Sequence, residues 1–280
     1  ILAASSSSCI GRKTWPPYDM IMISLSSSRF ILHSWTILDS FMNMFYETLY
    51  YKENLYAITK IIFTFLNYYS LWCGGWLSLF YCIKVASFTQ SLFIWLKQRI
   101  ARLVPWMLLT SWLCSIIAAI SFAWDVYSVH NFTAPSSMRN SSALRITRED
   151  SLGVLLFLSN ASICLPLILS VVSSVLLIWS LWMHTRQMQN NASGFRDPSL
   201  EAHISAIKSV CSFLMLYIIY FILVLVILFN VFSPLSNGEL MCTAVMAACP
   251  TGHTMVLIWS NPKFRELPAR IWRHTNCLIR

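Results

Sequence analysis

Charged side chains are unevenly spaced along the chain and leave long stretches without Asp, Glu, Lys or Arg. Five such stretches cover residues 61–83, 103–124, 151–184, 209–238 and 240–262. A helix needs about 20 apolar residues to cross a bilayer core of about 30 Å, so each stretch can span a membrane. Residues 20–45 form a sixth candidate, although Arg29 and Asp39 interrupt it. The pattern predicts six spans, which puts both ends of the chain on one side.

Composition agrees with this pattern. The chain has 280 residues, of which 57% are hydrophobic and 11% are charged, and its net charge is +9. A soluble globular domain carries about 25% charged residues, so these side chains are too few to cover a water-facing surface. We therefore predict an all-α, polytopic membrane helix bundle. The composition argues against a soluble enzyme or a nucleic-acid-binding domain.

Lys and Arg are shared unequally between the two sides that the spans define. Fourteen lie at the start, in the 84–103 and 184–208 loops and in the tail, whereas four lie on the opposite side. Short cytoplasmic loops carry the excess of Lys and Arg, so both ends are predicted to be cytosolic. The outer loop, about residues 125–150, carries glycosylation sequons at Asn131 and Asn140, which become candidate glycosylation sites if that loop faces the lumen; which of them is used stays open.

Enzyme and metal signatures are missing from the sequence. It contains no H-E-x-x-H, no C-x-x-C and no Gly-rich phosphate loop. We predict no enzymatic activity, no cofactor and no metal site. A small membrane transporter is the alternative from another class, but it needs ionisable residues at mid-span and related halves, which the spans mostly lack.

Three residues inside the spans suggest internal contacts or moving parts. Arg29 lies near mid-membrane, where a charge usually faces the bundle interior and a partner. We favour such a structural or switching contact; the alternative is a shifted helix whose Arg29 reaches the interface. Pro166 and Pro250 are expected to kink their helices, which would leave room for a ligand or serve structure alone.

The span after residue 60 is rich in aromatic side chains. Phe63, Asn67 and Ser70 share one helical face. That face combines apolar area with a hydrogen-bonding amide, which suits a small-molecule pocket. Ordinary helix packing is the alternative for the same face.

Several motifs, in order, resemble those of the type 2 bitter taste receptors. Phe80-Tyr-Cys-Ile-Lys-Val-Ala-Ser-Phe-Thr89 is similar to the family's FYxLKIANFS, and Leu25-Ser-Ser-Ser-Arg29 to its LxxSR. Ser180-Leu-Trp-Met-His-Thr-Arg-Gln-Met188 and Asp197-Pro-Ser-Leu-Glu-Ala-His203 resemble the segments around helices five and six. Cys249-Pro-Thr-Gly-His253 resembles the seventh-helix YPxxH, with Cys in place of Tyr.

The resemblance implies a seven-helix G protein-coupled receptor of the plasma membrane that binds small bitter compounds. It implies ligand contacts at Phe63, Thr64, Asn67, Tyr68, Tyr217, Tyr220, Val224, Thr243 and Met246. A gustducin-like G protein would meet an inner surface with Lys84, Arg99, His184 and Gln187. Intramembrane structural or switching roles fall on Arg29, Pro166, Pro250 and His253.

The resemblance also turns the six spans into helices two to seven. We expect residues 1–19 to hold a residual helix one and the first inner loop, 20–262 the remaining helices, and 263–280 a cytosolic tail. The chain starts at Ile1 rather than Met, and the family's first-helix Asn motif is not found. The alternative to a working receptor is therefore a non-functional fragment or pseudogene product of one.

Overall fold

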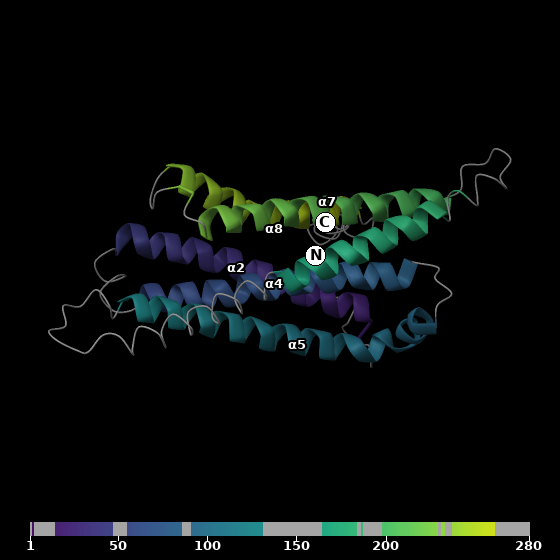
Figure 1. Cartoon of the computed structure of the whole chain (residues 1–280), viewed down its shortest axis with the longest axis horizontal. Coiled ribbons are helices and arrows are strands. Elements are labelled where there is room, and N and C mark those ends of the chain that lie inside the picture. The colour runs from purple at the N-terminus through teal and green to yellow at the C-terminus, as the bar shows by residue number, and fades with distance from the viewer. Residues whose placement is uncertain are drawn as a thin grey trace, which may run out of the picture. The chain divides into compact units, whose positions relative to one another are not determined.

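A computed structural model describes residues 2, 15–46, 55–85, 91–130, 164–183, 186, 198–228, 231–232 and 237–260. These residues form α-helices and no strand, as the sequence predicted (Figure 1). The labelled helices are α2 (Pro17–Phe45), α4 (Leu55–Val85), α5 (Ser91–His130), α7 (Pro198–Leu228) and α8 (Asn237–Ser260). A further helix covers Cys164–Met183. The predicted sites at Asn131, Asn140, His184 and Gln187 lie outside the described residues.

The helices do not end where the charge-free stretches end. α5 begins at Ser91 and α7 at Pro198, so the predicted 84–103 and 184–208 loops are wrong over their later parts. Charge marks where a helix leaves the bilayer, whereas its backbone hydrogen bonds continue into water. In the other direction, α7 ends at Leu228 and Val231 is not helical, so the predicted span to residue 238 is also wrong.

Local sequence accounts for where α2 begins. Its first residue is Pro17 and its first turn holds Asp19, three residues before the predicted start at Met20. Proline suits the first helical position because that position needs no backbone N–H, and a carboxylate there favours the positive end of the helix dipole. The span pattern missed this first turn because Asp19 is charged.

Large apolar side chains of α5 face outward and small ones face inward. Trp112, Leu113 and Ile117 are about half exposed, whereas Ser111, Ser115 and Ala118 are fully buried. The Ser111 and Ser115 hydroxyls donate to carbonyl oxygens one turn earlier, each at 2.7 Å. This arrangement suits lipid on the outside and close helix packing inside. Length and composition qualify Phe93–Ser121 and Cys164–Met183 as membrane spans.

The chain divides into two compact units, each built from several helices. The Arg29 unit comprises Ser24–Gly75 and Arg102–Pro166; the Tyr217 unit comprises Ile1–Ile23, Trp76–Ala101 and Leu167–Arg280. In the Arg29 unit, the Trp35 indole Nε1 donates to the Thr59 carbonyl at 3.1 Å and joins α2 to α4. Phe65 of α4 meets Trp112 of α5 edge to face, with ring centroids 6.2 Å apart.

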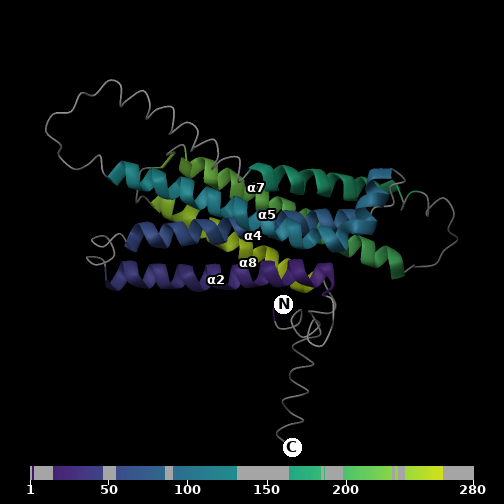
Figure 2. The same ribbon diagram turned by 90° about the horizontal axis from the view of Figure 1, so that it is seen from below.

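In the Tyr217 unit, α7 and α8 pack side by side (Figures 1 and 2). A Cβ on Gly252 would stand 3.4 Å from the Leu216 side chain, which is an ordinary van der Waals distance, so the two helices touch here without a need for glycine. A second core joins the end of α4, the start of α5, the Cys164–Met183 helix and α7. We call it the Leu181 core; its buried members are Cys82, Leu177, Leu181 and Val210.

Candidate functional site

The predicted ligand positions form two sets, one in each unit. In the Arg29 unit, α4 places Thr64, Asn67 and Tyr68 in buried positions, whereas Phe63 is half-buried. Asn67 and Thr64 are three residues apart, so they share a helical face. This face holds a primary amide and a hydroxyl beside aromatic area, and it can offer hydrogen bonds to a small ligand.

Arg29 contacts α4 one turn along from Asn67. Its side chain is buried, and its Nε donates to the Ser70 hydroxyl at 3.3 Å. Nearby on α4, the Tyr69 side chain is hydrogen-bonded to Ser24 and Cys73. These contacts link α2 to α4 at mid-helix. A membrane-embedded guanidinium needs such polar partners because lipid offers none.

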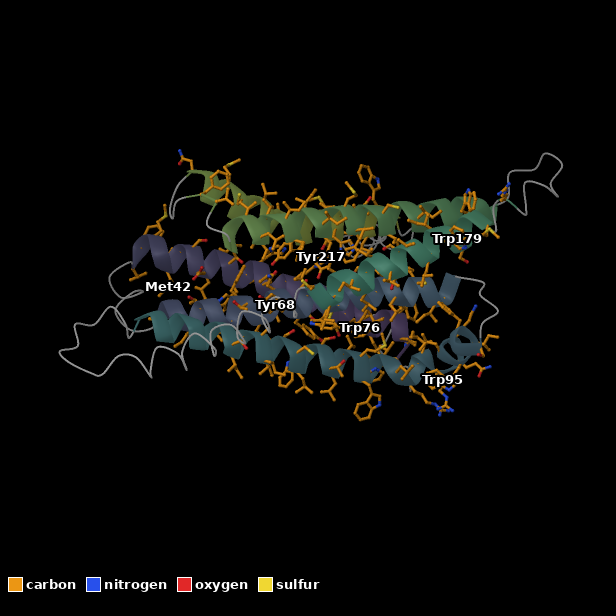
Figure 3. All side chains as sticks on the ribbon, in the orientation of Figure 1. Met42, Tyr68, Trp76, Trp95, Trp179 and Tyr217 are labelled. Atoms are coloured by element: carbon orange, nitrogen blue, oxygen red, sulfur yellow. The ribbon has the colours of Figure 1, made fainter. Side chains whose placement is uncertain are left out.

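In the Tyr217 unit, the aromatic positions of α7 form a continuous ring ladder. Tyr220 and Tyr217 are both buried and stack at 6.4 Å between centroids. Tyr217 stacks on Phe213 at 5.6 Å, and Phe213 meets the His253 ring of α8 at 4.3 Å. We call these four residues the ring ladder. It connects two predicted ligand positions to α8; Figure 3 labels Tyr217.

α8 continues as a helix through Pro250. Proline has no N–H to donate one turn back, which weakens the helix locally. The Thr254 hydroxyl donates to the Pro250 carbonyl at 2.9 Å, and His253 lies buried between these two residues in sequence. His253, the last ring of the ring ladder, thus lies in the segment of α8 that Pro250 weakens.

The remaining predicted positions range from fully buried to exposed. Val224 and Met246 are half-buried, Pro166 is fully buried, and Thr243 lies in α8 with its side chain outside the described part. The structure places Lys84 on the exposed end of α4, with its Nζ 5.8 Å from the Phe80 ring centroid. Arg99 is exposed, and its guanidinium lies 5.2 Å from the Trp95 ring.

Sequence reasoning missed Phe213, the middle of the ring ladder. Phe213, Tyr217 and Tyr220 follow one another at four and three residues, which is the spacing of one helical face. That periodicity was the available signal. A second missed group joins Tyr18 of α2 to the end of α4, where its ring lies 6.1 Å from Phe80 and 6.2 Å from Tyr81.

Metal chemistry finds no support in the parts of the chain that the structure describes. Within them, no three His, Cys, Asp or Glu side chains gather in a way that could hold a metal ion. The described cysteines are all free thiols. The clusters found are aromatic and hydrogen-bonding, which suits recognition and conformational coupling.

Comparison with known proteins gives one consistent result. The family model described as "Taste receptor protein (TAS2R)" matches residues 1–276. The chain is 56% identical to taste receptor type 2 member 40 of Gallus gallus, over all of this chain and 90% of that protein. It is 36% identical to taste receptor type 2 member 39 of Papio hamadryas, over 98% and 80% of the two chains. It is 34% identical to member 2 of Homo sapiens, over 91% and 84%. The chain therefore belongs to the type 2 taste receptor family, the bitter taste receptors, which are multi-pass, G protein-coupled membrane receptors and not enzymes.

Proposed function

We propose that this receptor binds bitter small molecules in the outer half of its helix bundle and signals through a gustducin-like heterotrimeric G protein. The observation that carries the proposal is the ring ladder, which starts at Tyr220 and Tyr217 and ends at His253. A ligand that contacts its first rings has a direct mechanical path to α8. Two predicted ligand positions, Tyr217 and Tyr220, then belong to the same packed array as His253.

Each of the two sets of ligand positions takes part in recognition within its own unit. Aromatic and apolar area from Phe63, Tyr68, Tyr217 and Tyr220, with Val224, Thr243 and Met246, supplies most of the affinity. Asn67 and Thr64 direct the ligand through hydrogen bonds. An apolar surface accepts ligands of many shapes, whereas one directed hydrogen bond fixes the orientation of each ligand.

Transmission of the ligand signal depends on a difference between the ligand's affinities for the active and inactive arrangements. A ligand shifts the receptor toward its active arrangement only to the extent that it binds that arrangement more tightly. We propose that tilting of Tyr217 moves Phe213 and with it His253, and that α8 bends at Pro250. The weakened helix at Pro250 provides the two arrangements that such a switch requires.

The inner surface contacts the G protein. With both ends cytosolic, as the Lys and Arg distribution favours, Lys84 and Arg99 face the cytosol together with His184 and Gln187. The positive charge of Lys84 and Arg99 suits an acidic partner surface and speeds association. The outer loop on the opposite side then carries glycans at Asn131 and Asn140, so enzymatic deglycosylation of the surface receptor should remove two glycans, and an unglycosylated surface receptor would contradict this orientation.

Replacing Asn67 with Ala tests the directed hydrogen bond. One net hydrogen bond is worth about 1 kcal/mol, so the agonist concentration for half-maximal calcium release should rise about fivefold to tenfold. The measurement is agonist-evoked calcium release in cells that co-express a suitable G protein, over a panel of bitter compounds.

The matched control is Ile58→Ala on the same helix, because Ile58 is 51% exposed and faces away from the interior. Its potency should stay within about twofold of the unmodified receptor. Unchanged potency of Asn67→Ala across the whole panel would show that Asn67 does not anchor ligands.

A further inference from the structure

A short pattern, Trp-x-x-x-Arg, occurs twice in the Tyr217 unit. Trp95 and Arg99 lie near the start of α5, and Trp182 and Arg186 follow the same spacing at the end of the Cys164–Met183 helix. Each guanidinium lies over its tryptophan ring, at 5.2 Å for Arg99 and 5.5 Å for Arg186. The same cation–π pair thus occurs near the start of α5 and across the end of the Cys164–Met183 helix.

Both pairs are attached to the Leu181 core. Leu181, next to Trp182, is a buried member of that core, and Phe93, two residues before Trp95, packs against it. The tryptophans themselves point outward: Trp95 is 46% exposed and Trp182 is 52% exposed. Trp95 and Trp179, the neighbour of Trp182, lie toward the same end of the helices (Figure 3). The pairs are thus exposed side chains next to a buried apolar core.

The outward face of the Cys164–Met183 helix continues as apolar surface. On the Cys164–Met183 helix, Trp182 follows exposed Trp179, Val175 and Val172 at helical spacing, and Trp179 contacts Trp182 at 5.9 Å. Exposed apolar stripes of this kind face lipid tails. Tryptophan at the end of such a stripe lies at the level of the lipid headgroups. Arg186 follows Trp182 beyond the end of this stripe, whereas Arg99 lies one turn further into α5 than Trp95.

Basic residues predominate around both pairs, and the first acidic residue after the second pair is Asp197. Residues 84–102 contain Lys84, Lys97, Arg99 and Arg102 and no Asp or Glu, and residues 179–196 contain Arg186 and Arg196 and no acid. A guanidinium that stacks on an indole still presents its N–H edge in its own plane. That edge matches a phosphate through two parallel hydrogen bonds.

We propose that the two Trp–Arg pairs bind phosphate groups of anionic phospholipids in the cytosolic leaflet. The indole rests in the headgroup region, and the arginine edge holds the phosphate. This inference goes beyond ligand recognition and rests on the proposed cytosolic orientation only. The lipid would hold the inner ends of α5 and the Cys164–Met183 helix at a fixed depth, next to the Leu181 core.

The test uses the purified receptor without agonist or G protein. Binding of phosphatidylinositol 4,5-bisphosphate is counted by native mass spectrometry, against phosphatidylcholine as the neutral lipid. Each basic residue near an anionic surface is worth about fivefold in affinity, so the double variant Arg99→Gln, Arg186→Gln should bind the anionic lipid about 25-fold more weakly. Binding of the neutral lipid should not change.

The matched control is Lys97→Gln, which removes the same charge from an exposed residue between Trp95 and Arg99. It should lose clearly less affinity than Arg99→Gln, and Trp95→Leu should lose affinity although it keeps the charge. If Lys97→Gln and Arg99→Gln lost equal affinity for the anionic lipid, binding would depend on overall positive charge rather than on the Trp–Arg pairs. That result would overturn the proposal. So would a double variant that binds the anionic lipid as tightly as the unmodified receptor.

Discussion

Phe213→Ala is expected to uncouple agonist binding from G protein activation. Phe213 is buried and touches both Tyr217 and His253, so its removal breaks the ring ladder in the middle. Coupling between two sites is typically worth about 1–3 kcal/mol, so the signalling response should fall about 5-fold to 150-fold. Agonist binding should weaken far less than signalling, because the ring does not belong to the predicted ligand positions.

Calcium release and ligand binding must be measured on the same variants to see this difference. Phe213→Leu keeps most of the volume and loses the flat ring, so it should preserve expression and still reduce coupling. Met215→Ala is the control on the same helix, since Met215 is 60% exposed. Normal signalling by a well-expressed Phe213→Leu variant would show that ring stacking does not transmit the signal.

Ser70→Ala is expected to give the largest loss of stability among conservative changes in the Arg29 unit. The Ser70 hydroxyl accepts from the Arg29 Nε at 3.3 Å in a buried environment. Loss of a hydrogen bond to a charged group inside the membrane should cost about 1–2 kcal/mol. For a chain of this size, that corresponds to a decrease in Tm of about 3–6 °C.

Thermal unfolding of the purified receptor measures this effect. Ser27→Ala is the control, because the Ser27 hydroxyl donates only within its own helix, to the Ser24 carbonyl at 3.1 Å. The double variant Arg29→Met, Ser70→Ala should be more stable than the sum of the single losses implies, since both single changes remove the same hydrogen bond. Strict additivity would argue that the two side chains do not interact.

The helices themselves were largely predictable from sequence. Six charge-free or nearly charge-free stretches each fall on a helix of the described chain, because lipid forces every spanning backbone to satisfy its own hydrogen bonds. Helix ends were not predictable in the same way. Arg99 and Lys97 lie within α5 rather than in a loop, since a helix can continue in water after it leaves the bilayer.

The candidate site was predictable in part. Motif resemblance led to Tyr217, Tyr220 and His253, which the structure places in one ring ladder, and to Asn67, which it places in a buried position. It did not lead to Phe213, because an extra Phe in a span rich in apolar residues is indistinguishable from packing. Only the tertiary structure shows that its ring lies between Tyr217 and His253.

By itself, the sequence determined that the chain is a membrane bundle and which family it resembles. Hydropathy and loop charge are properties of short segments, so they can be determined from the sequence without the tertiary structure. The tertiary structure decided which polar side chains meet, such as Arg29 with Ser70, and which rings stack across α7 and α8. Those contacts depend on the rotation of one helix against another. Several faces of each apolar helix could contact lipid equally well. The rotation is therefore set by the fit between helices and not by the sequence pattern of any single helix.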